Sequence, residues 1–191
     1  MTIKEVFSSF FYEIIKNDIF FINTVDNNCR IFYFWGNNME NYEINRQTLA
    51  IIPLEDELTK IVEEEREIIL RQSTLKIIDE SCRYFGSSYE GRFEGTKSIM
   101  GISHKAPIII EESSKMIFFP TTSPRLNTCA WISLNNIKNY YKDDVDTVIV
   151  FNCGKKIKFE LSYGIIDNQI LRSTRLEALL DKRVGCVLKK Y

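Results

Sequence analysis

The chain has 191 residues, of which 45% are hydrophobic and 13 are phenylalanine, so it is long and apolar enough to bury the core of one ordinary domain. This composition excludes a chain that is disordered throughout. The formal net charge is −1, which excludes a protein that binds polyanions through bulk positive charge. Any nucleic-acid surface must therefore be local.

Charge is distributed unevenly along the chain. Residues 54–67 carry seven acidic and two basic side chains, whereas residues 154–191 carry nine basic and four acidic ones. The C-terminal part could therefore meet phosphate groups while the acidic run stays in solvent. Taken alone, a run of like charges is more typical of a solvated face than of a binding site.

Cysteine usage and hydropathy indicate a cytoplasmic protein. The five cysteines are odd in number, widely scattered and never in a C-x-x-C pair, which favours a reducing compartment over a disulfide framework or a zinc site. Glu13, Lys16 and Asp18 interrupt the apolar patches of the first 22 residues, so no run reaches the roughly 18 to 20 apolar residues of a membrane span. The sequence therefore predicts no membrane span and no signal peptide.

The first third of the chain predicts one helix and two strands. Apolar side chains at helical spacing predict an amphipathic helix near the start: Phe7, Phe10, Phe11 and Ile14 or Ile15. Residues 42–53 predict a strand that ends at a proline. We expect the acidic stretch that follows, through residue 64, to form a loop or a short helix, and residues 67–71 to form a second strand.

Two short helices joined at Gly86 come next. Apolar side chains recur on one face of the first helix, over residues 75–85: Leu75, Ile78, Cys82 and Phe85. Ser73 or Thr74 can cap its start, and Gly86 is the kind of residue at which helices commonly end. Ser87 and Glu90 have the spacing of a capping box, which predicts a second helix over residues 88–100.

The second helix has an unusually smooth side. Gly91, Gly95 and Ser98 leave this side with almost no side chain. Each glycine costs about 1 kcal/mol of helix stability relative to alanine, so we expect the close approach of another backbone to offset the cost. That partner could be protein or phosphate.

The chain after Pro107 predicts short strands and a final helix. Two hairpins are expected, one over residues 108–110 and 116–119 and one over residues 147–151 and 156–161. The remaining elements are a loop over residues 120–127, a strand over 130–134 and a helix over 165–180. In that helix, Ile166, Ile170 and Leu171 should point inward, with Arg172 and Arg175 near the other side. Together the elements predict an α+β fold: a single compact domain with a mixed, mostly antiparallel sheet of short strands, a central helix pair and a C-terminal helix.

The region from about residue 41 to 172 resembles a known family. The motifs that carry the resemblance are residues 81–92 (SCRYFGSSYEGR), Gly95-Thr96, residues 102–107 (ISHKAP) and residues 129–133 (CAWIS). They are similar in type, spacing and order to the competence transcription factors, the ComK-like regulators of Gram-positive bacteria. We therefore divide the chain into residues 1–38, an aromatic-rich segment outside the resemblance, and residues 39–191, a competence-factor-like DNA-binding domain. Met39 is a candidate natural start.

The resemblance implies a transcriptional activator of competence (DNA-uptake) genes. It implies recognition of A/T-rich boxes in double-stranded DNA, largely through the minor groove, by a homo-oligomer, either a dimer or a tetramer. It also implies RNA polymerase and a proteolytic adaptor as partners. In the family the adaptor docks on a further C-terminal segment, whereas this sequence stops at Lys189-Lys190-Tyr191. The alternative is a divergent or truncated paralogue that acts as a protein-interaction module with little DNA binding.

Nothing in the sequence points to an enzyme. His104 is the only histidine, and between Ser103 and Lys105 it suits a loop hydrogen bond or a phosphate contact better than a catalytic base. The sequence has no phosphate-loop, dinucleotide-binding or nucleophile-elbow motif. It has no paired metal ligands either, so we expect neither a metal nor a cofactor.

Five cations of the family-like region are candidate DNA contacts: Arg83, Arg92, Lys97, Lys105 and Arg172. Arginine suits the narrow minor groove of A/T tracts because that groove has an enhanced negative potential, while lysine and backbone N–H groups can hold phosphates. In the alternative interpretation, Arg83 and Arg92 pair with Glu80, Glu90 or Glu94 and only fix the helix pair.

The helix, glycine turn and helix also resemble a helix-turn-helix motif, whose second helix would enter the major groove. Here that helix offers Gly91, Glu94 and Gly95 where base-reading side chains should be, so we favour the minor groove. The large aromatic residues Phe85 and Trp131 are expected in the core rather than as stacking platforms for bases.

Overall fold

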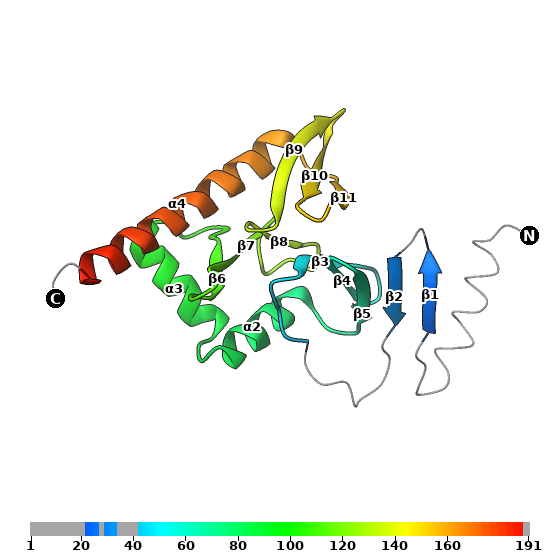
Figure 1. The fold of residues 1–191 in the computed structure, drawn as a ribbon, viewed down its shortest axis with the longest axis horizontal. Coiled ribbons are helices and arrows are strands. Elements are labelled where there is room, and N and C mark those ends of the chain that lie inside the picture. The colour runs from blue at the N-terminus through cyan, green and yellow to red at the C-terminus, as the bar shows by residue number, and fades with distance from the viewer. Residues whose placement is uncertain (1–21, 27–28, 34–41, 189–191) are drawn as a thin grey trace, which may run out of the picture.

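The computed structural model describes residues 22–26, 29–33 and 42–188 (Figure 1). Within these residues the chain forms three layers: a helix pair, an eight-stranded sheet, and a third layer made of a three-stranded sheet and a long helix. The predicted α+β class is confirmed. No helix in this part of the chain is both long enough and apolar enough to cross a membrane.

The large sheet has the strand order β1-β2-β5-β4-β3-β8-β7-β6. Its neighbouring strands are antiparallel except for β2 and β5, which are parallel. The bounds are β1 (Ile22–Asp26), β2 (Cys29–Tyr33), β3 (Thr48–Pro53), β4 (Thr59–Glu63), β5 (Arg66–Leu70), β6 (Ile108–Glu111), β7 (Met116–Pro120) and β8 (Trp131–Ser133). The sheet is therefore mixed and mostly antiparallel, as predicted.

Helices α2 (Thr74–Tyr84) and α3 (Tyr89–Met100) cover one face of this sheet. Side chains along a strand alternate between faces, so Phe118 and Trp131 belong to the core under the helices, while their neighbours Phe119 and Ile132 belong to the core on the other face. Trp131 is fully buried, which confirms its predicted place in the core, and Phe85 is half-buried against the same cluster.

The third layer covers the opposite face of the large sheet. It contains β9 (Ile137–Asp143), β10 (Asp146–Phe151), β11 (Lys156–Phe159) and the helix α4 (Tyr163–Leu188). The three strands are antiparallel in the order β11-β10-β9. Farther along α4, Leu176 packs in a third cluster with Met100 from the end of α3 and with Ile109 and Ile117 from β6 and β7. Helices α3 and α4 therefore meet where the β6–β7 hairpin lies.

Both predicted helices of the pair are confirmed, with one correction at their junction. Ser73 Oγ accepts the N–H of Lys76 at 3.3 Å and caps α2, and Gly86 takes a left-handed φ of 77° just after that helix. At the start of α3, Ser88 rather than Ser87 is the cap, because its Oγ accepts the N–H of Gly91 at 3.1 Å. The predicted capping box is therefore wrong. The residue three positions after the Ser88 cap is Gly91, which has no carboxylate to accept the backbone N–H of the cap.

Other predictions were wrong in part. The acidic stretch through residue 64 contains strand β4, whose Ile61 and Val62 are buried on opposite faces of the sheet. Strand β9 was not predicted, and α4 runs beyond both ends of the expected helix. Leu171 was expected to point inward, but it is 62% exposed. The strand at residues 67–71, the strand at 130–134, the loop at 120–127 and both hairpins are confirmed to within two residues.

Part of the segment before residue 39 forms the antiparallel hairpin β1–β2, which extends the large sheet through the parallel pairing of β2 with β5. The amphipathic helix expected near the start of the chain, at residues 7–15, lies outside the described residues. The division at residue 38 stays a prediction.

A buried carboxylate holds the start of the family-like region to the sheet. Glu63, at the end of β4, is 1% exposed. Its Oε1 accepts hydrogen bonds from the hydroxyl of Tyr42 at 2.7 Å and from Nδ2 of Asn45 at 2.9 Å, and its Oε2 accepts one from Arg66. Burial alone raises the pKa of the Glu63 carboxyl, but these three bonds outweigh burial and hold that pKa below its ordinary value.

Candidate nucleic-acid interface

Arg83 lies on the solvent side of α2 beside an acidic partner. Its Nε–H donates to Asp79 Oδ2 at 2.7 Å, one helical turn earlier, and its side chain is 65% exposed. The predicted pairing with a carboxylate is therefore present, although the partner is Asp79 rather than Glu80. Because exposed ion pairs contribute between about 0 and 1 kcal/mol, this guanidinium can exchange its partner for a phosphate at little cost.

Arg92 lies in a different environment. Its side chain is 13% exposed, and its Nη1 donates to Oε1 of Glu112 at the tip of the β6–β7 hairpin. Burial raises the pKa of the Cys82 thiol to about 12, and the positive charge of Arg92 acts to lower it. The guanidinium of Arg92 therefore lies close to this buried thiol. The Nε of Arg92 is buried and has no hydrogen-bond partner among the described residues. Arg92 therefore joins α3 to the hairpin, and most of its side chain is buried.

Lys97 faces solvent on α3, where its Nζ lies 2.9 Å from Oε1 of Glu94, one turn earlier. Both side chains are about half exposed. Like Arg83, this lysine belongs to a weak surface pair that leaves it accessible.

Lys105 and Arg172 come together from distant parts of the sequence. Gln169 of α4 donates from Nε2 to the carbonyl oxygen of Lys105 at 3.1 Å and to that of Pro120 at 2.6 Å. One turn later, Nη1 of Arg172 donates to the carbonyl oxygen of His104 at 3.3 Å. These bonds fix the loop between α3 and β6 against α4. In the described part of the chain, neither Lys105 nor Arg172 has a carboxylate within ion-pair distance.

One further cation joins this surface. Arg175 is exposed three residues after Arg172 and therefore on the same side of α4. His104, Lys105, Arg172 and Arg175 are called the loop–α4 cluster below. The sequence predicted Arg172 and Arg175 near the same side of the helix at residues 165–180, and this shared side was the signal that could have added Arg175 to the candidate contacts.

Arg125, which was not predicted, is exposed in the loop between β7 and β8. Burial and the charge of Glu90 raise the pKa of the Tyr89 phenol to about 12, whereas the charge of Arg125 acts to lower it. Because Tyr89 is the first residue of α3, Arg125 lies near the start of that helix. Burial likewise raises the pKa of the Cys129 thiol in the same loop to about 11, and Lys105 opposes that rise. Residues 120–128 contain no acid, and this was the signal in the sequence that could have singled out Arg125.

The smooth side of α3 is open. A Cβ built on Gly95 would meet no atom within 4 Å, and one on Gly91 would meet only the hydroxyl oxygens of Ser87 and Ser88, at 3.2 and 3.4 Å. The close protein backbone that the sequence led us to expect is therefore absent from the described residues. The side remains available to a molecule that comes from outside.

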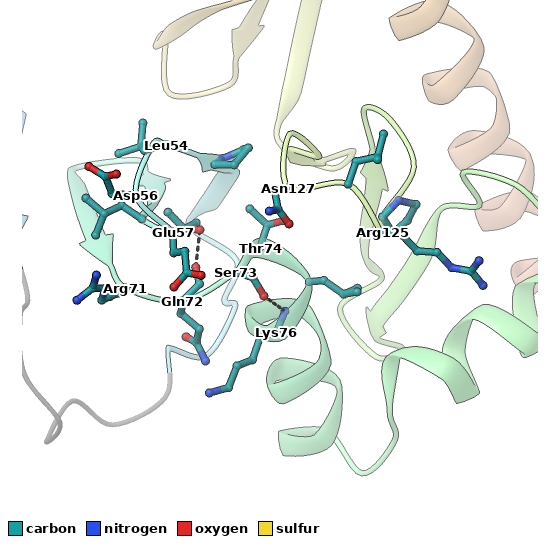
Figure 2. Close-up of a pocket in the computed structure, with 16 residues that line it drawn as sticks. Leu54, Asp56, Glu57, Arg71, Gln72, Ser73, Thr74, Lys76, Arg125 and Asn127 are labelled. Atoms are coloured by element: carbon teal, nitrogen blue, oxygen red, sulfur yellow. Dashed lines mark hydrogen bonds between the residues drawn. The ribbon is translucent and has the colours of Figure 1, made fainter.

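A cavity of about 580 Å³ lies apart from the loop–α4 cluster, beside the start of α2 (Figure 2). The turn between β3 and β4 forms one wall and the loop between β7 and β8 the other. Leu54 and Leu126, on these two walls, are 40% and 52% exposed. Figure 2 shows the guanidinium of Arg125 pointing away from the cavity, so this residue adds no charge to its interior.

Comparisons with known proteins bear on the whole of this region. The family model described as "ComK protein" matches residues 39–185. The competence transcription factor of Bacillus subtilis (strain 168) is 36% identical over 150 residues, which cover 76% of this chain and 78% of that protein. No solved structure matches. Because the family model covers the sheet from β3 onward, both layers that cover it and every candidate cation, the chain belongs to the ComK protein family, and the resemblance of residues 81–133 is confirmed.

Proposed function

We propose that this protein is a transcriptional activator of competence genes that binds double-stranded, A/T-rich DNA, largely through the minor groove. Membership of the ComK family and the name of the Bacillus subtilis relative support a competence transcription regulator rather than an enzyme. Such a protein acts in the cytoplasm, together with RNA polymerase, and a proteolytic adaptor is the second partner that we expect.

The meeting of Lys105 with Arg172 is the observation that carries DNA binding. The chain has a net charge of −1, so affinity for a polyanion requires cations gathered in one place without acidic partners. The loop–α4 cluster meets this requirement, because the loop between α3 and β6 is bonded to α4 and brings Lys105 beside the arginines of the helix. Arg172 and Arg175 suit a narrow groove, and Lys105 suits a phosphate.

The open side of α3 supports the same function. The glycines at positions 91 and 95 reduce helix stability, and the described residues place no protein backbone against them. A DNA backbone that lies along α3 would contact this side closely. Arg83 and Lys97 would then supply charge from exposed pairs, whereas Arg92 would act from within by holding α3 against the hairpin.

Mobility-shift assays on a duplex with two A-tract boxes, and on a G/C duplex of equal length, test this function. We expect tighter binding to the A-tract duplex, competition by a minor-groove-binding drug, and an affinity that falls steeply with salt. Replacing both Lys105 and Arg172 by alanine should weaken binding by about tenfold or more and reduce the salt slope by about 2, because each lost phosphate contact lowers the slope by about 1.

The matched control replaces two other exposed cations, Arg46 before β3 and Lys156 on β11, by alanine. It removes the same charge from other places and should leave the affinity nearly unchanged. Equal losses in the two double variants would mean that DNA is attracted by overall charge, and binding that ignores A/T content would contradict minor-groove recognition.

The cavity beside α2 favours a second candidate function, that of a protein-interaction module with little DNA binding. Its volume and its two exposed leucines are suited to a short peptide segment of a partner. This candidate predicts no retarded DNA at low salt and a stable complex of the purified chain with an active member of the family. Replacing Leu54 and Leu126 by serine would break that complex and leave DNA binding intact.

A further inference from the structure

The strand β9 forms an open edge of the three-stranded sheet. In that sheet β10 lies between β9 and β11, so no strand of the described residues pairs with the other side of β9. Five of its seven side chains are exposed: Lys138, Asn139, Tyr141, Lys142 and Asp143. An exposed edge of this length offers unpaired N–H and C=O groups to another strand.

The register with β10 shows which backbone groups of β9 point away from β10, toward the open edge. Asp143 and Asp146 flank a two-residue turn and pair with each other, and residues flanking such a turn exchange their hydrogen bonds. Backbone groups alternate in direction along an antiparallel strand. The N–H and C=O groups of Asn139, Tyr141 and Asp143 therefore bond to β10, while those of the even-numbered residues point to the open edge. The N–H of Tyr140 agrees with this direction, since it donates to the side chain of Asn139 at 2.8 Å rather than to β10, and pairing at the edge would replace this local bond.

Charge then selects one way for β9 to pair with a copy of itself. In a symmetric antiparallel pair centred on Tyr140, Lys138 would face Lys142 of the other copy twice, and like charges directly opposite each other are unfavourable. When the centre moves to Tyr141, Lys138 faces Asp144 and Asn139 faces Asp143. In this register Tyr140 faces Lys142 of the other copy. The backbone groups of both residues point to the open edge, so the two residues can exchange hydrogen bonds.

We propose that a second copy of this chain pairs with β9 through this edge, antiparallel and centred on Tyr141. The pair would form about four hydrogen bonds between the main chains, and the two copies of Tyr141, which is 42% exposed, would pack against each other on the two-fold axis. The contact rests on the proposed function, for which the family resemblance implies a homo-oligomer, but it does not require DNA.

A cysteine at the centre of the pair tests the register. Tyr141 would occupy a non-hydrogen-bonded position, where opposite Cα atoms are about 4.5 Å apart, within the roughly 4.4 to 6.8 Å that a disulfide spans. In a background with Cys153→Ser, which removes an exposed native thiol, Tyr141→Cys should form a disulfide-linked dimer under oxidation. Asn139→Cys is the matched control, because its two copies would lie about 14 Å apart and could not be linked.

Sedimentation of the full chain without DNA gives an independent measurement. We expect an association that depends on concentration, and Lys138→Glu should weaken it about tenfold because the substitution faces Asp144 twice. Lys156→Glu, on the opposite edge strand β11, should leave it unchanged. Hydrogen exchange at the amides of Tyr140 and Lys142 should slow as the concentration rises.

Three results would overturn this interface: equal cross-linking of the two cysteine variants, equal effects of the two glutamate variants, or a monomer at all concentrations. A monomer that still retards A/T-rich DNA would overturn the interface alone. A dimer with the expected cross-link that fails to bind DNA would support the interface and contradict the proposed function.

Discussion

Asp79 of α2 accepts the backbone N–H of Tyr89, the first residue of α3, at 2.8 Å. The other oxygen of the same carboxylate accepts the Nε–H of Arg83 at 2.7 Å. One side chain therefore satisfies a free N–H at the start of α3 and also orients the arginine that faces solvent on α2. Burial acts to raise the pKa of the Asp79 carboxyl, but the two hydrogen bonds and the Arg83 charge outweigh it and lower the pKa.

Replacing Asp79 by alanine should loosen the junction between the two helices. Both of its hydrogen bonds would be lost, and we expect the free energy of unfolding to fall by about 1 to 2 kcal/mol. Urea denaturation measures the loss, and hydrogen exchange at the Tyr89 amide should become faster. Glu94→Ala, which removes a carboxylate that is about half exposed from α3, is the control and should change stability by less than about 0.5 kcal/mol. An Asp79 variant as stable as this control would show that Gly86 and the core alone set the junction.

The two arginines of the helix pair should respond differently to alanine. Arg92→Ala removes a side chain that is largely buried, together with its bond to Glu112, so we expect a loss of about 2 kcal/mol in unfolding free energy. Arg83→Ala should cost less than about 0.5 kcal/mol and should instead weaken DNA binding with a smaller salt slope. Thermal unfolding and mobility shifts on the same preparations check both statements. A stable Arg92→Ala protein with weakened DNA binding would reverse the two roles.

The buried carboxylate of Glu63 should make the fold sensitive to acid. Its pKa is lower in the folded chain than in the unfolded one, so its contribution is present above the unfolded pKa of about 4.3 and is lost as the pH falls through the folded value. Glu63→Gln should reduce stability by about 2 kcal/mol at pH 7 and flatten the decline below about pH 5. The control is Glu55→Gln, an exposed residue of the turn between β3 and β4. Urea denaturation at several pH values measures both, and an unchanged decline in the Glu63 variant would assign the acid sensitivity to other groups.

The elements that could be predicted are those whose signals are local. The apolar face of α2, its cap Ser73 and the left-handed Gly86 all lie within a few residues of the structure that they specify. The cap of α3 was misplaced by one residue, because two serines stand side by side there. Strand β9 could not be found in this way, because both of its faces are mostly exposed and its sequence IKNYYKD has no apolar alternation. Strand β4 was missed because only two central residues, Ile61 and Val62, carry the apolar signal within a mostly acidic run.

The candidate site depended more on tertiary structure. Arg83 and Arg92 look alike in the sequence, but only Arg92 has the hairpin tip within reach, and its partner Glu112 lies 20 residues farther along the chain. Lys105 and Arg172 were predicted separately, and the bonds that join the loop to α4 span 64 and 68 residues. Such pairings are set by the packing of α4 across the sheet, which no local pattern encodes.

Gly95→Ala should separate the stability of α3 from its function. The site is open and its φ is not left-handed, so a methyl group meets no atom within 4 Å and the helix should gain about 0.5 to 1 kcal/mol. If DNA contacts the smooth side closely, the same methyl group should weaken binding, and Gly95→Leu should weaken it further. Ser98→Ala, which adds no bulk on the same helix, is the control for both measurements. A Gly95→Ala protein that is more stable and binds A/T-rich DNA as tightly as the parent chain would remove α3 from the interface and leave the loop–α4 cluster to bind DNA without it.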